Sequence, residues 1–358
     1  QSAPGGAPHG APAESRFGVE AVMKSDAPRP SPPPPTSAPP DELLRMVRGW
    51  QESRIVLSAI ELDVFSAVGP GATATDIARR LGLDPRGADI LLHALAALGL
   101  LEKLGDTFRN GALADRHLRA GGSHDVRAAL GHQVDLWYRW THLSEVVRTG
   151  RPAPRAEHES GGESFIAAMH MNASARAPKV VAALGLAGMR RALDLGGGSG
   201  AYAIALARAV PGLHVDVVDT PGVVPLTRRY VSEAGLEDRI TAREGDLLVG
   251  EYGHGYDLAL LSAVCHMLGR DENESLIHRA ARALGPGGRL VIQDFVLDPD
   301  RTSPRPAAVF AVNMLVNTTA GNNYTEADYF GWMHAAGLSD LRRVALEEPT
   351  TLLVGRQD

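Results

Sequence analysis

A glycine-rich segment over residues 192–206, ALDLGGGSGAYAIAL, carries the clearest chemical signal in the chain. An apolar stretch ends at Asp194, then Gly196, Gly198 and Gly200 alternate with other residues before an apolar helical pattern begins. Glycines at this spacing let the backbone turn tightly and approach a ligand closely. Nicotinamide and flavin sites use related spacing, so the segment alone indicates a nucleotide-like ligand of unspecified kind.

Three carboxylates at predicted strand ends narrow that ligand. Asp194 lies two residues before Gly196, where it is placed to face an ammonium group. Asp219 ends the strand HVDVVD, at a position suited to accept hydrogen bonds from ribose hydroxyls. In EGDLL, Asp246 is expected near an adenine amino group and Leu247 against the ring. The set predicts a nucleoside-type cofactor and favours S-adenosylmethionine over NAD, although Asp219 or Asp246 as a helix cap remains the alternative.

The elements that position these residues alternate between strand and helix from Arg190 onward. This order predicts a doubly wound, mostly parallel α/β sheet. The expected strands are Arg191–Leu195, His214–Val218, Ile240–Arg243, Asp257–Ser262 and Arg289–Phe295. The last two apolar segments, LRRVALEE and TTLLVGR, flank Pro349 and predict an antiparallel hairpin with a tight turn. A parallel sheet closed by such a hairpin is more typical of methyltransferases than of dinucleotide dehydrogenases, so we expect a Rossmann-like methyltransferase domain.

The part that precedes this domain is expected to be mostly helical. Apolar residues recur at helical spacing from residue 43 to residue 64. A helix, a turn and a second helix then lead into two short predicted strands, Gly99–Lys103 and Thr107–Arg109, which is the order of a winged helix. Thr75 is a possible cap of the first helix, and Pro85 suits the first turn of the second.

A winged helix raises the question of DNA binding. The second helix, Pro85 to Leu98, carries one basic residue, Arg86, and is otherwise mostly apolar. A recognition helix needs side chains that reach phosphates and base edges. We therefore expect this module to pack against another subunit and not against nucleic acid.

Two aromatic and methionine-rich stretches lie between the winged helix and the glycine loop. Both read as helices, and as a group they are candidates for the wall of an aromatic acceptor's pocket. For any single residue, ordinary core packing is the simpler interpretation. The residues predicted to line the pocket from this region are Trp137, Trp140, Phe165, Met169 and His170.

Length and composition fit a globular protein of several parts. The chain has 358 residues, of which 44% are hydrophobic and 22% charged, with a net charge of −6, unlike a basic nucleic-acid binder. The single cysteine, Cys265, excludes an internal disulfide, and no apolar run reaches the roughly 20 residues of a membrane span. A cytoplasmic protein without membrane contact is therefore expected. The predicted parts are a disordered Pro-rich tail (1–40), a winged-helix-like dimerisation domain (41–122), a helical substrate-pocket segment (123–188) and a cofactor-binding domain (189–358).

Several motifs in order resemble the caffeate/acetylserotonin type of O-methyltransferase. They are LDLGGGSGAYAIALARAVPGLHVDVVDTPGVV, EGDLL, CHML with DEN, LGPGGRLVIQDFVLDPD and FAVNMLVNTTAGNNYTEADYFGWMHAAGL, and the resemblance covers roughly residues 42–358. It implies S-adenosylmethionine as cofactor, a dimer held by the N-terminal domain, a metal-independent mechanism and a small hydroxylated, often aromatic, acceptor. The absence of an HExxH motif or a Cys/His cluster also predicts no metal.

The resemblance assigns a general base and its partner. His266, just after the fourth strand, matches the base of this family, and Asp294, at the end of the fifth, matches an acid that orients it. Chemistry supports the choice, because imidazole has a pKa near 6.5 and can accept the proton of a phenol whose pKa is near 10. A thiol–imidazole pair with Cys265 is not expected, since neighbouring strand residues point to opposite faces.

Two positions depart from the family pattern. Asn323 stands where many members have Glu, and Met267 where an Asp usually follows the base. These departures leave open a more acidic acceptor, or methylation of nitrogen or carbon. A winged-helix regulator that uses the fold as a cofactor sensor is the alternative from another class. The resemblance also adds Gly245 and Ser262 to the cofactor site, and to the acceptor pocket it adds Phe310, Asn313, Met314 and Asn323.

Overall fold

The computed structural model describes residues 40–155, 161–346 and 349–358. The tail predicted for residues 1–40 therefore lies outside the described residues, except for Pro40. Helix α1 (Asp41–Arg48) belongs to a different compact unit from residues 50–358. Its acidic side chains lie in the first turn and its basic ones in the last, as the helix dipole favours.

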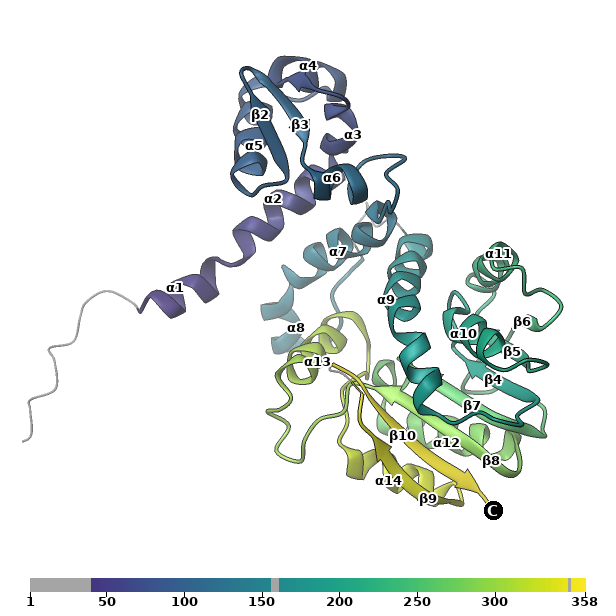
Figure 1. Cartoon of the computed structure of the whole chain (residues 1–358). Helices are drawn as coiled ribbons and strands as arrows, with labels where there is room; N and C mark the ends of the chain where they lie inside the picture. The colour runs from purple at the N-terminus through teal and green to yellow at the C-terminus, as the bar shows by residue number, and fades with distance from the viewer. Residues whose placement is uncertain (1–39, 156–160, 347–348) are drawn as a thin grey trace, which may run out of the picture. The chain divides into compact units, whose positions relative to one another are not determined.

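The N-terminal part of the larger unit has the predicted helix-turn-helix and strand order (Figure 1). Its elements are α2 (Trp50–Glu61), α3 (Val64–Val68), β1 (Ala72–Thr73), α4 (Ala74–Leu81), α5 (Pro85–Ala97), β2 (Leu101–Leu104), β3 (Thr107–Asn110) and α6 (Ala112–His117). The three strands pair in the order β1-β3-β2 around a core that includes Phe65, Ile77 and Phe108.

The cap predicted for α4 was wrong by two residues. Thr73, not Thr75, precedes the helix in an extended conformation, and its Oγ1 accepts a hydrogen bond from the Asp76 amide at 3.2 Å. Thr75 lies inside the first turn, where its backbone is already helical. Asp84 caps α5 by accepting from the Gly87 amide at 2.7 Å, and Pro85 occupies the first turn as predicted.

The connecting segment is helical. It consists of α7 (Arg127–Trp140), α8 (Leu143–Thr149) and the long α9 (Gly161–Ala183). Helix α7 packs on both α2 and α9, and α9 in turn packs on α10 (Ala201–Ala209). This segment therefore joins the N-terminal elements to the C-terminal sheet.

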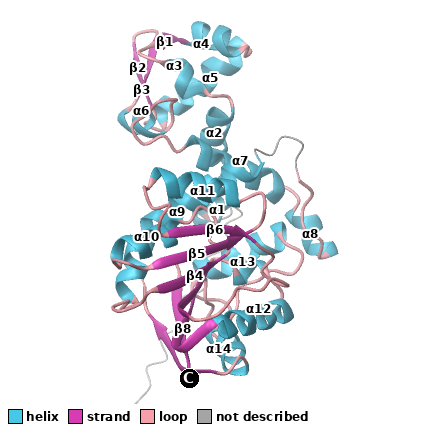
Figure 2. Cartoon of the chain, turned by 90° about the vertical axis from the view of Figure 1, so that its right-hand side faces the viewer, coloured by secondary structure: helices cyan, strands magenta, loops and turns pink. Residues whose placement is uncertain are grey.

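The C-terminal part is a seven-stranded sheet in the order β6-β5-β4-β7-β8-β10-β9 (Figure 2). The strands are β4 (Arg191–Leu195), β5 (His214–Asp219), β6 (Ile240–Glu244), β7 (Tyr256–Ser262), β8 (Leu284–Asp294), β9 (Leu338–Val344) and β10 (Thr351–Gln357). β4 to β8 run parallel, and β10 lies antiparallel between β8 and β9. The predicted Rossmann-like fold with a closing hairpin is confirmed.

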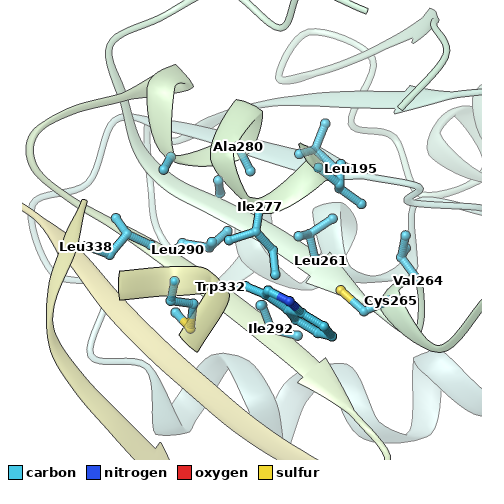
Figure 3. Packing of buried hydrophobic residues seen from close by; sticks show 14 of the residues in the cluster. Leu195, Leu261, Val264, Cys265, Ile277, Ala280, Leu290, Ile292, Trp332 and Leu338 are labelled. Atoms are coloured by element: carbon cyan, nitrogen blue, oxygen red, sulfur yellow. The ribbon is translucent and has the colours of Figure 1, made fainter. Parts of the chain in front are cut away.

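Helices cover both faces of this sheet. α9, α10 and α11 (Val224–Glu233) pack on one face. α12 (Arg270–Ala283) and α14 (Glu326–Ala335) pack on the other, where Ile277 and Trp332 meet Leu261 and Ile292 of the central strands (Figure 3). α13 (Arg305–Asn317) follows β8 and contacts α7 and α8. Two apolar layers thus hold the strand ends in place.

Several predicted strand boundaries differ from the structure. β8 begins at Leu284 and not at Arg289, because Leu284 pairs with Tyr256 before a bulge, after which pairing resumes between Arg289 and Leu258. Strand β9 begins at Leu338, because Gly337 ends α14 with a φ of 84° and the strand follows at once. Strand β10 begins at Thr351. The turn predicted near Pro349 includes residues 347–348, which lie outside the described residues.

Candidate active site

The glycine loop connects β4 to α10 and takes a conformation that side chains rarely adopt. Gly196, Gly198 and Gly200 have φ values of 70°, 57° and 75°. Gly197 was not among the predicted site residues, yet a Cβ there would lie 2.6 Å from Val217 Cγ1. Its signal in the sequence is only its place in the run of three glycines. Gly245 is similarly confined, because a Cβ would lie 2.7 Å from Val218 Cγ1.

The Gly198 peptide is held from both sides. Its N–H donates to Asp219 Oδ2 at 2.8 Å, and its carbonyl accepts from Thr227 Oγ1 at 2.6 Å. The other carboxylate oxygen of Asp219 accepts from the Thr220 amide at 2.7 Å. Helix α11 begins five residues after Asp219, with Val223 at its cap position, so Asp219 does not cap it. Asp219 therefore fixes the loop, and its half-buried oxygens keep further acceptor capacity.

Asp194 is a fully buried carboxylate beneath this loop. Neither of its oxygens makes a hydrogen bond within ordinary limits, and Oδ2 lies 2.8 Å from the position a Gly197 Cβ would take. Burial, and then the negative charge of Asp219, raise the pKa of Asp194 to about 7, which the nearby Ala203 amide offsets only in part. Such a group is costly unless a cation or a donor approaches it.

The EGDLL segment lies beside the glycine loop. A Cβ on Gly196 would lie 3.3 Å from Leu247 Cδ1 and 2.7 Å from Val264 Cγ2. Asp246 is exposed and accepts from the Leu248 amide at 2.8 Å within a turn. Ser262, at the end of β7, donates to Gln293 Oε1 at 2.7 Å. The site combines a tight glycine loop, a buried carboxylate without a hydrogen-bond partner, and carboxylates at neighbouring strand ends. These features fit an adenosine that carries an ammonium group.

His266 and Asp294 form a close, buried pair. The two residues come from the ends of β7 and β8, and His266 Nδ1 lies 2.6 Å from Asp294 Oδ1. The same carboxylate accepts from the backbone amides of His266 at 3.1 Å and Phe295 at 2.8 Å. Because a carboxylate accepts hydrogen bonds, Nδ1 carries the proton. Nε2 has no hydrogen-bond partner among the described residues and is the free nitrogen.

The local structure around the base differs from the expectation in one respect. Cys265, His266 and Met267 form a short 3₁₀ helix, η1, so the argument from alternating strand faces does not apply. Cys265 instead points into the core between the sheet and α12 (Figure 3). Burial, and then the charge of Asp294, raise the pKa of its thiol well above 9. The thiol is therefore held in its protonated, unreactive form.

Two residues that sequence reasoning missed hold η1 in place. The Asn273 side-chain amide donates to Cys265 O at 2.9 Å, Gly269 O at 3.0 Å and Leu268 O at 3.2 Å. Its position in DEN, as a polar residue on the buried face of α12, was the available signal. Ala263 turns the chain out of β7 with a φ of 58°, a conformation that costs a non-glycine residue of order 1–3 kcal/mol.

Aromatic rings surround the imidazole. Phe310 meets it edge to face at 4.9 Å between ring centroids, and Phe295 lies at 6.1 Å. The two phenyl rings stack on each other at 4.0 Å. Phe295 was not predicted, although it directly follows Asp294. Met314 lies one helical turn after Phe310 on α13 and is buried. The base thus has an apolar, aromatic surrounding on the α13 side.

The comparisons with known proteins agree with this geometry. Residues 140–339 match the O-methyltransferase domain and residues 44–120 the O-methyltransferase dimerisation domain. The 3-hydroxy-5-methyl-1-naphthoate 3-O-methyltransferase of Streptomyces sahachiroi is 35% identical over 330 residues, which cover 88% of this chain and 94% of the relative.

Two solved structures are also similar. An O-methyltransferase family protein from Burkholderia thailandensis has a TM-score of 0.81 and 30% identity, covering 90% of this chain and 99% of its own. Human N-acetylserotonin methyltransferase, solved with S-adenosylmethionine, has a TM-score of 0.77 and 26% identity with the same coverage. This chain belongs to the O-methyltransferase family. It is an S-adenosylmethionine-dependent methyltransferase.

In the methyltransferase, a polar network links α7 to α13. Trp140 Nε1 donates to Asn313 Oδ1 at 2.9 Å, and Asn317 Nδ2 donates to the same oxygen at 3.1 Å. Asn323 is buried and donates to Ala307 O at 2.5 Å, while its Oδ1 has no partner. At the position of the family's second acid, the methyltransferase therefore has a donor that holds the first turn of α13.

The remaining predicted pocket residues lie in other surroundings. Trp137 packs against Trp50 of α2 at 6.0 Å between ring centroids. Phe165 is 39% exposed and meets His132 edge to face, and Met169 is half-buried on α9. His170 contacts the glycine loop and Tyr230. The structure thus joins Phe310, Met314, Asn313 and Trp140 on the α13 side but not all predicted residues in one group.

The described residues contain no group of three or more His, Cys, Asp or Glu side chains arranged to hold a metal ion. Within the same residues, no helix is both long and apolar enough to cross a bilayer.

Proposed function

We propose that the methyltransferase transfers a methyl group from S-adenosylmethionine to a hydroxyl of a small aromatic metabolite, with His266 as general base. The observation that carries the proposal is the buried His266–Asp294 pair, which leaves Nε2 free at the carboxyl ends of the strands. Active sites of open α/β sheets lie at this edge.

The cofactor, when bound, supplies an electrophilic methyl group on a sulfonium sulfur. Gly196 to Gly200 and Gly245 would border it closely, with Asp219 accepting from ribose hydroxyls. Asp246 and Leu247 would lie at the adenine, and Asp194 would balance the ammonium charge. Ser262 would complete the site at the end of β7. The steric confinement of Gly197 and Gly245 and the orphaned carboxylate of Asp194 support this arrangement.

His266 and Asp294 divide the proton chemistry between them. Nε2 of His266 takes the proton of the acceptor hydroxyl as its oxygen becomes nucleophilic. Asp294, held by three N–H donors, fixes the imidazole in the required tautomer and stabilises the imidazolium. General-base catalysis of this kind supplies roughly 10²–10⁴-fold in rate.

An aromatic acceptor suits the surroundings of the base. The stacked Phe295 and Phe310 offer flat apolar area beside His266, and Met314 and Trp140 extend it along α13 and α7. The relative from Streptomyces sahachiroi is named for methylating a hydroxynaphthoate. We propose the same class of acceptor, a hydroxylated aromatic compound, for the methyltransferase.

A panel of hydroxylated arenes tests the function. The purified protein is incubated with S-adenosylmethionine and phenols, naphthols and hydroxynaphthoates, and methyl gain is detected by mass spectrometry. Each acceptor is paired with its O-methyl ether. A methylated product from the free hydroxyl and none from the ether supports O-methylation. Methyl gain on the ether of a phenol or naphthol as well places the methyl on carbon, one of the alternatives that Met267 and Asn323 leave open.

We further propose that the methyltransferase is a homodimer assembled through residues 41–122. The match of residues 44–120 to the dimerisation domain supports this, as do exposed apolar side chains such as Trp50 and Ile90. Light scattering at micromolar concentration is expected to give twice the monomer mass. A gel shift with random-sequence DNA at low salt is expected to show no binding, against the regulator alternative.

A further inference from the structure

The imidazole of His170 lies between α9 and the glycine loop. Its Nδ1 is 2.8 Å from Ser199 Oγ, within GGGSG, and its Nε2 is 3.2 Å from Ser174 Oγ, one turn further along α9. The ring stacks on Tyr230 of α11 at 3.9 Å between centroids with an interplanar angle of 16°. Both nitrogens and one face of the ring are therefore engaged.

Ser199 makes this contact significant for cofactor binding. It is buried within the loop and directly follows Gly198, whose peptide is held by Asp219 and Thr227. His170 thus provides a third side-chain contact to the loop, and it comes from a different element than the other two. A hydroxyl bonded to a neutral imidazole is a typical buried hydrogen bond, whose loss leaves a polar group unpaired.

Helix α9 also borders the loop a second time. Ile166 Cδ1 lies 3.9 Å from the position of a Gly198 Cβ, so the helix touches the loop one turn before His170. Phe165, a candidate acceptor-pocket residue, is adjacent in sequence to Ile166. Phe165 itself packs edge to face on His132 of α7, so the same helix contacts both the cofactor loop and α7.

The surroundings of His170 favour the neutral form of its imidazole ring, which can both accept and donate a hydrogen bond. Burial lowers the pKa of His170, and the charge of Glu233 opposes this only in part. A neutral ring has one donor and one acceptor nitrogen, which matches the two serine hydroxyls.

We propose that His170 is a positioning residue that ties α9 to the glycine loop through Ser199, so that cofactor binding orders α9. This role concerns cofactor binding alone and does not rest on the proposed acceptor. The consequence is a coupling in which cofactor affinity and the order of α9 depend on one hydrogen bond.

Four variants separate this role from simple packing. His170→Ala removes the whole ring, whereas His170→Asn keeps a hydrogen-bonding group near the position of Nδ1. Ser199→Ala removes the partner in the loop. Ser174→Ala is the matched control, because it removes the hydrogen bond on the opposite side of the same ring. Circular dichroism and thermal melting confirm that each variant is folded.

The measurements use S-adenosylhomocysteine and need no acceptor. Calorimetry gives its affinity, and hydrogen-exchange mass spectrometry gives the protection it induces in peptides from α9. We expect His170→Ala to weaken binding about two- to tenfold and to abolish the protection. His170→Asn and Ser174→Ala are expected to stay close to the wild type in both. The double variant His170→Ala/Ser199→Ala is expected to bind no more weakly than either single variant.

Equal losses in His170→Ala and Ser174→Ala, or additive losses in the double variant, would overturn the proposal in favour of general packing. Failure of His170→Asn to restore protection would overturn it as well. A failure of the proposed function looks different. In that case no hydroxyl in the panel is methylated, while S-adenosylhomocysteine still protects α9 in a manner that depends on His170.

Discussion

The cofactor side and the base side of the active site are built in contrasting ways. On the cofactor side, the backbone groups of a five-residue loop are held by the side chains of Asp219, at the end of β5, and Thr227, on α11. On the base side, His266 is positioned by side chains from β8, α12 and α13, which are up to about 45 residues away in sequence. The cofactor side depends on the backbone conformation of one glycine-rich loop, whereas the base side depends on side chains that converge on one short turn.

The difference has an energetic counterpart. Asp294 is buried but satisfied, since three N–H groups donate to it. Asp194 is buried and unsatisfied, and its pKa is raised to about 7. A satisfied carboxylate serves catalysis through a fixed geometry. An unsatisfied carboxylate favours binding of a cation, at a cost to the stability of the protein.

Removal of the base is expected to give the largest effect and to leave the cofactor side intact. His266→Ala should lower turnover by roughly 10²–10⁴-fold. Its affinity for S-adenosylhomocysteine should not change, because no contact joins His266 to the glycine loop. Raising the pH toward the phenol pKa near 10 should partly restore turnover, because phenolate forms without a base. Steady-state rates from pH 6 to 10 and calorimetry provide the readouts.

Full activity of His266→Ala at neutral pH would contradict the general-base assignment. The methyl would then go to an atom that needs no base, and catalysis would rest on holding acceptor and sulfonium in line. Asp294→Asn serves as the graded control. Because it keeps the shape of the pair and removes the charge, its loss in turnover is expected to be smaller than that of His266→Ala.

On the cofactor side, Asp219→Ala is expected to weaken S-adenosylhomocysteine binding by at least about 100-fold, since hydrogen bonds to a charged acceptor contribute roughly 1.5–3 kcal/mol each. The variant also loses the acceptor for the Gly198 amide. Asp219→Asn retains one acceptor oxygen and should fall between Ala and the wild type. Calorimetry on folded variants measures both, and an unchanged affinity of Asp219→Ala would refute the role in ribose binding.

Asp194→Asn tests the unsatisfied carboxylate. A folded-state pKa of about 7, raised from 3.8, means that folding stability is lost as pH rises from about 4 to 7. Asp194→Asn should therefore stabilise the protein without cofactor by up to about 4 kcal/mol at pH 8 and by almost nothing at pH 4. It should also weaken S-adenosylmethionine binding. Denaturant unfolding at the two pH values and calorimetry provide the check, and equal stability at pH 8 would contradict the burial cost.

Because the cofactor side depends on a glycine-rich loop, sequence reasoning could predict a site there. The glycine spacing and the strand ends at Asp194 and Asp219 follow from short stretches of chain, and the mostly parallel sheet followed from the strand–helix alternation. The misplaced strand boundaries lie where a turn signal in the sequence competes with strand pairing. The segment LGPGG looks like a break in a strand, yet β8 runs through it as a bulge, with Leu284 paired to Tyr256 and Arg289 paired to Leu258.

The base side was predictable only in part. His266 and Asp294 were named from the family resemblance, but their 2.6 Å contact depends on the η1 turn, which residue spacing does not reveal. Asn273 was missed because its hydrogen bonds depend on the folded η1 turn, and Phe295 because its stacking depends on where α13 places Phe310. For the same reason His170 was assigned to the acceptor wall, whereas its contacts are with Ser199 and Tyr230.

The smallest expected effect concerns Asn323, where sequence comparison and structure suggest opposite outcomes. By the family pattern, Asn323→Glu should strengthen the base. In the structure, the Asn323 amide donates to Ala307 O at 2.5 Å in a buried position, and a carboxylate cannot replace that donor. Asn323→Glu should therefore lower the free energy of unfolding by about 1–3 kcal/mol without raising turnover. Asn323→Gln, which keeps an amide donor, is the control and should lose less stability. Thermal melts paired with steady-state rates decide between the two, because a rise in kcat at unchanged stability would show that position 323 supports the base and not α13.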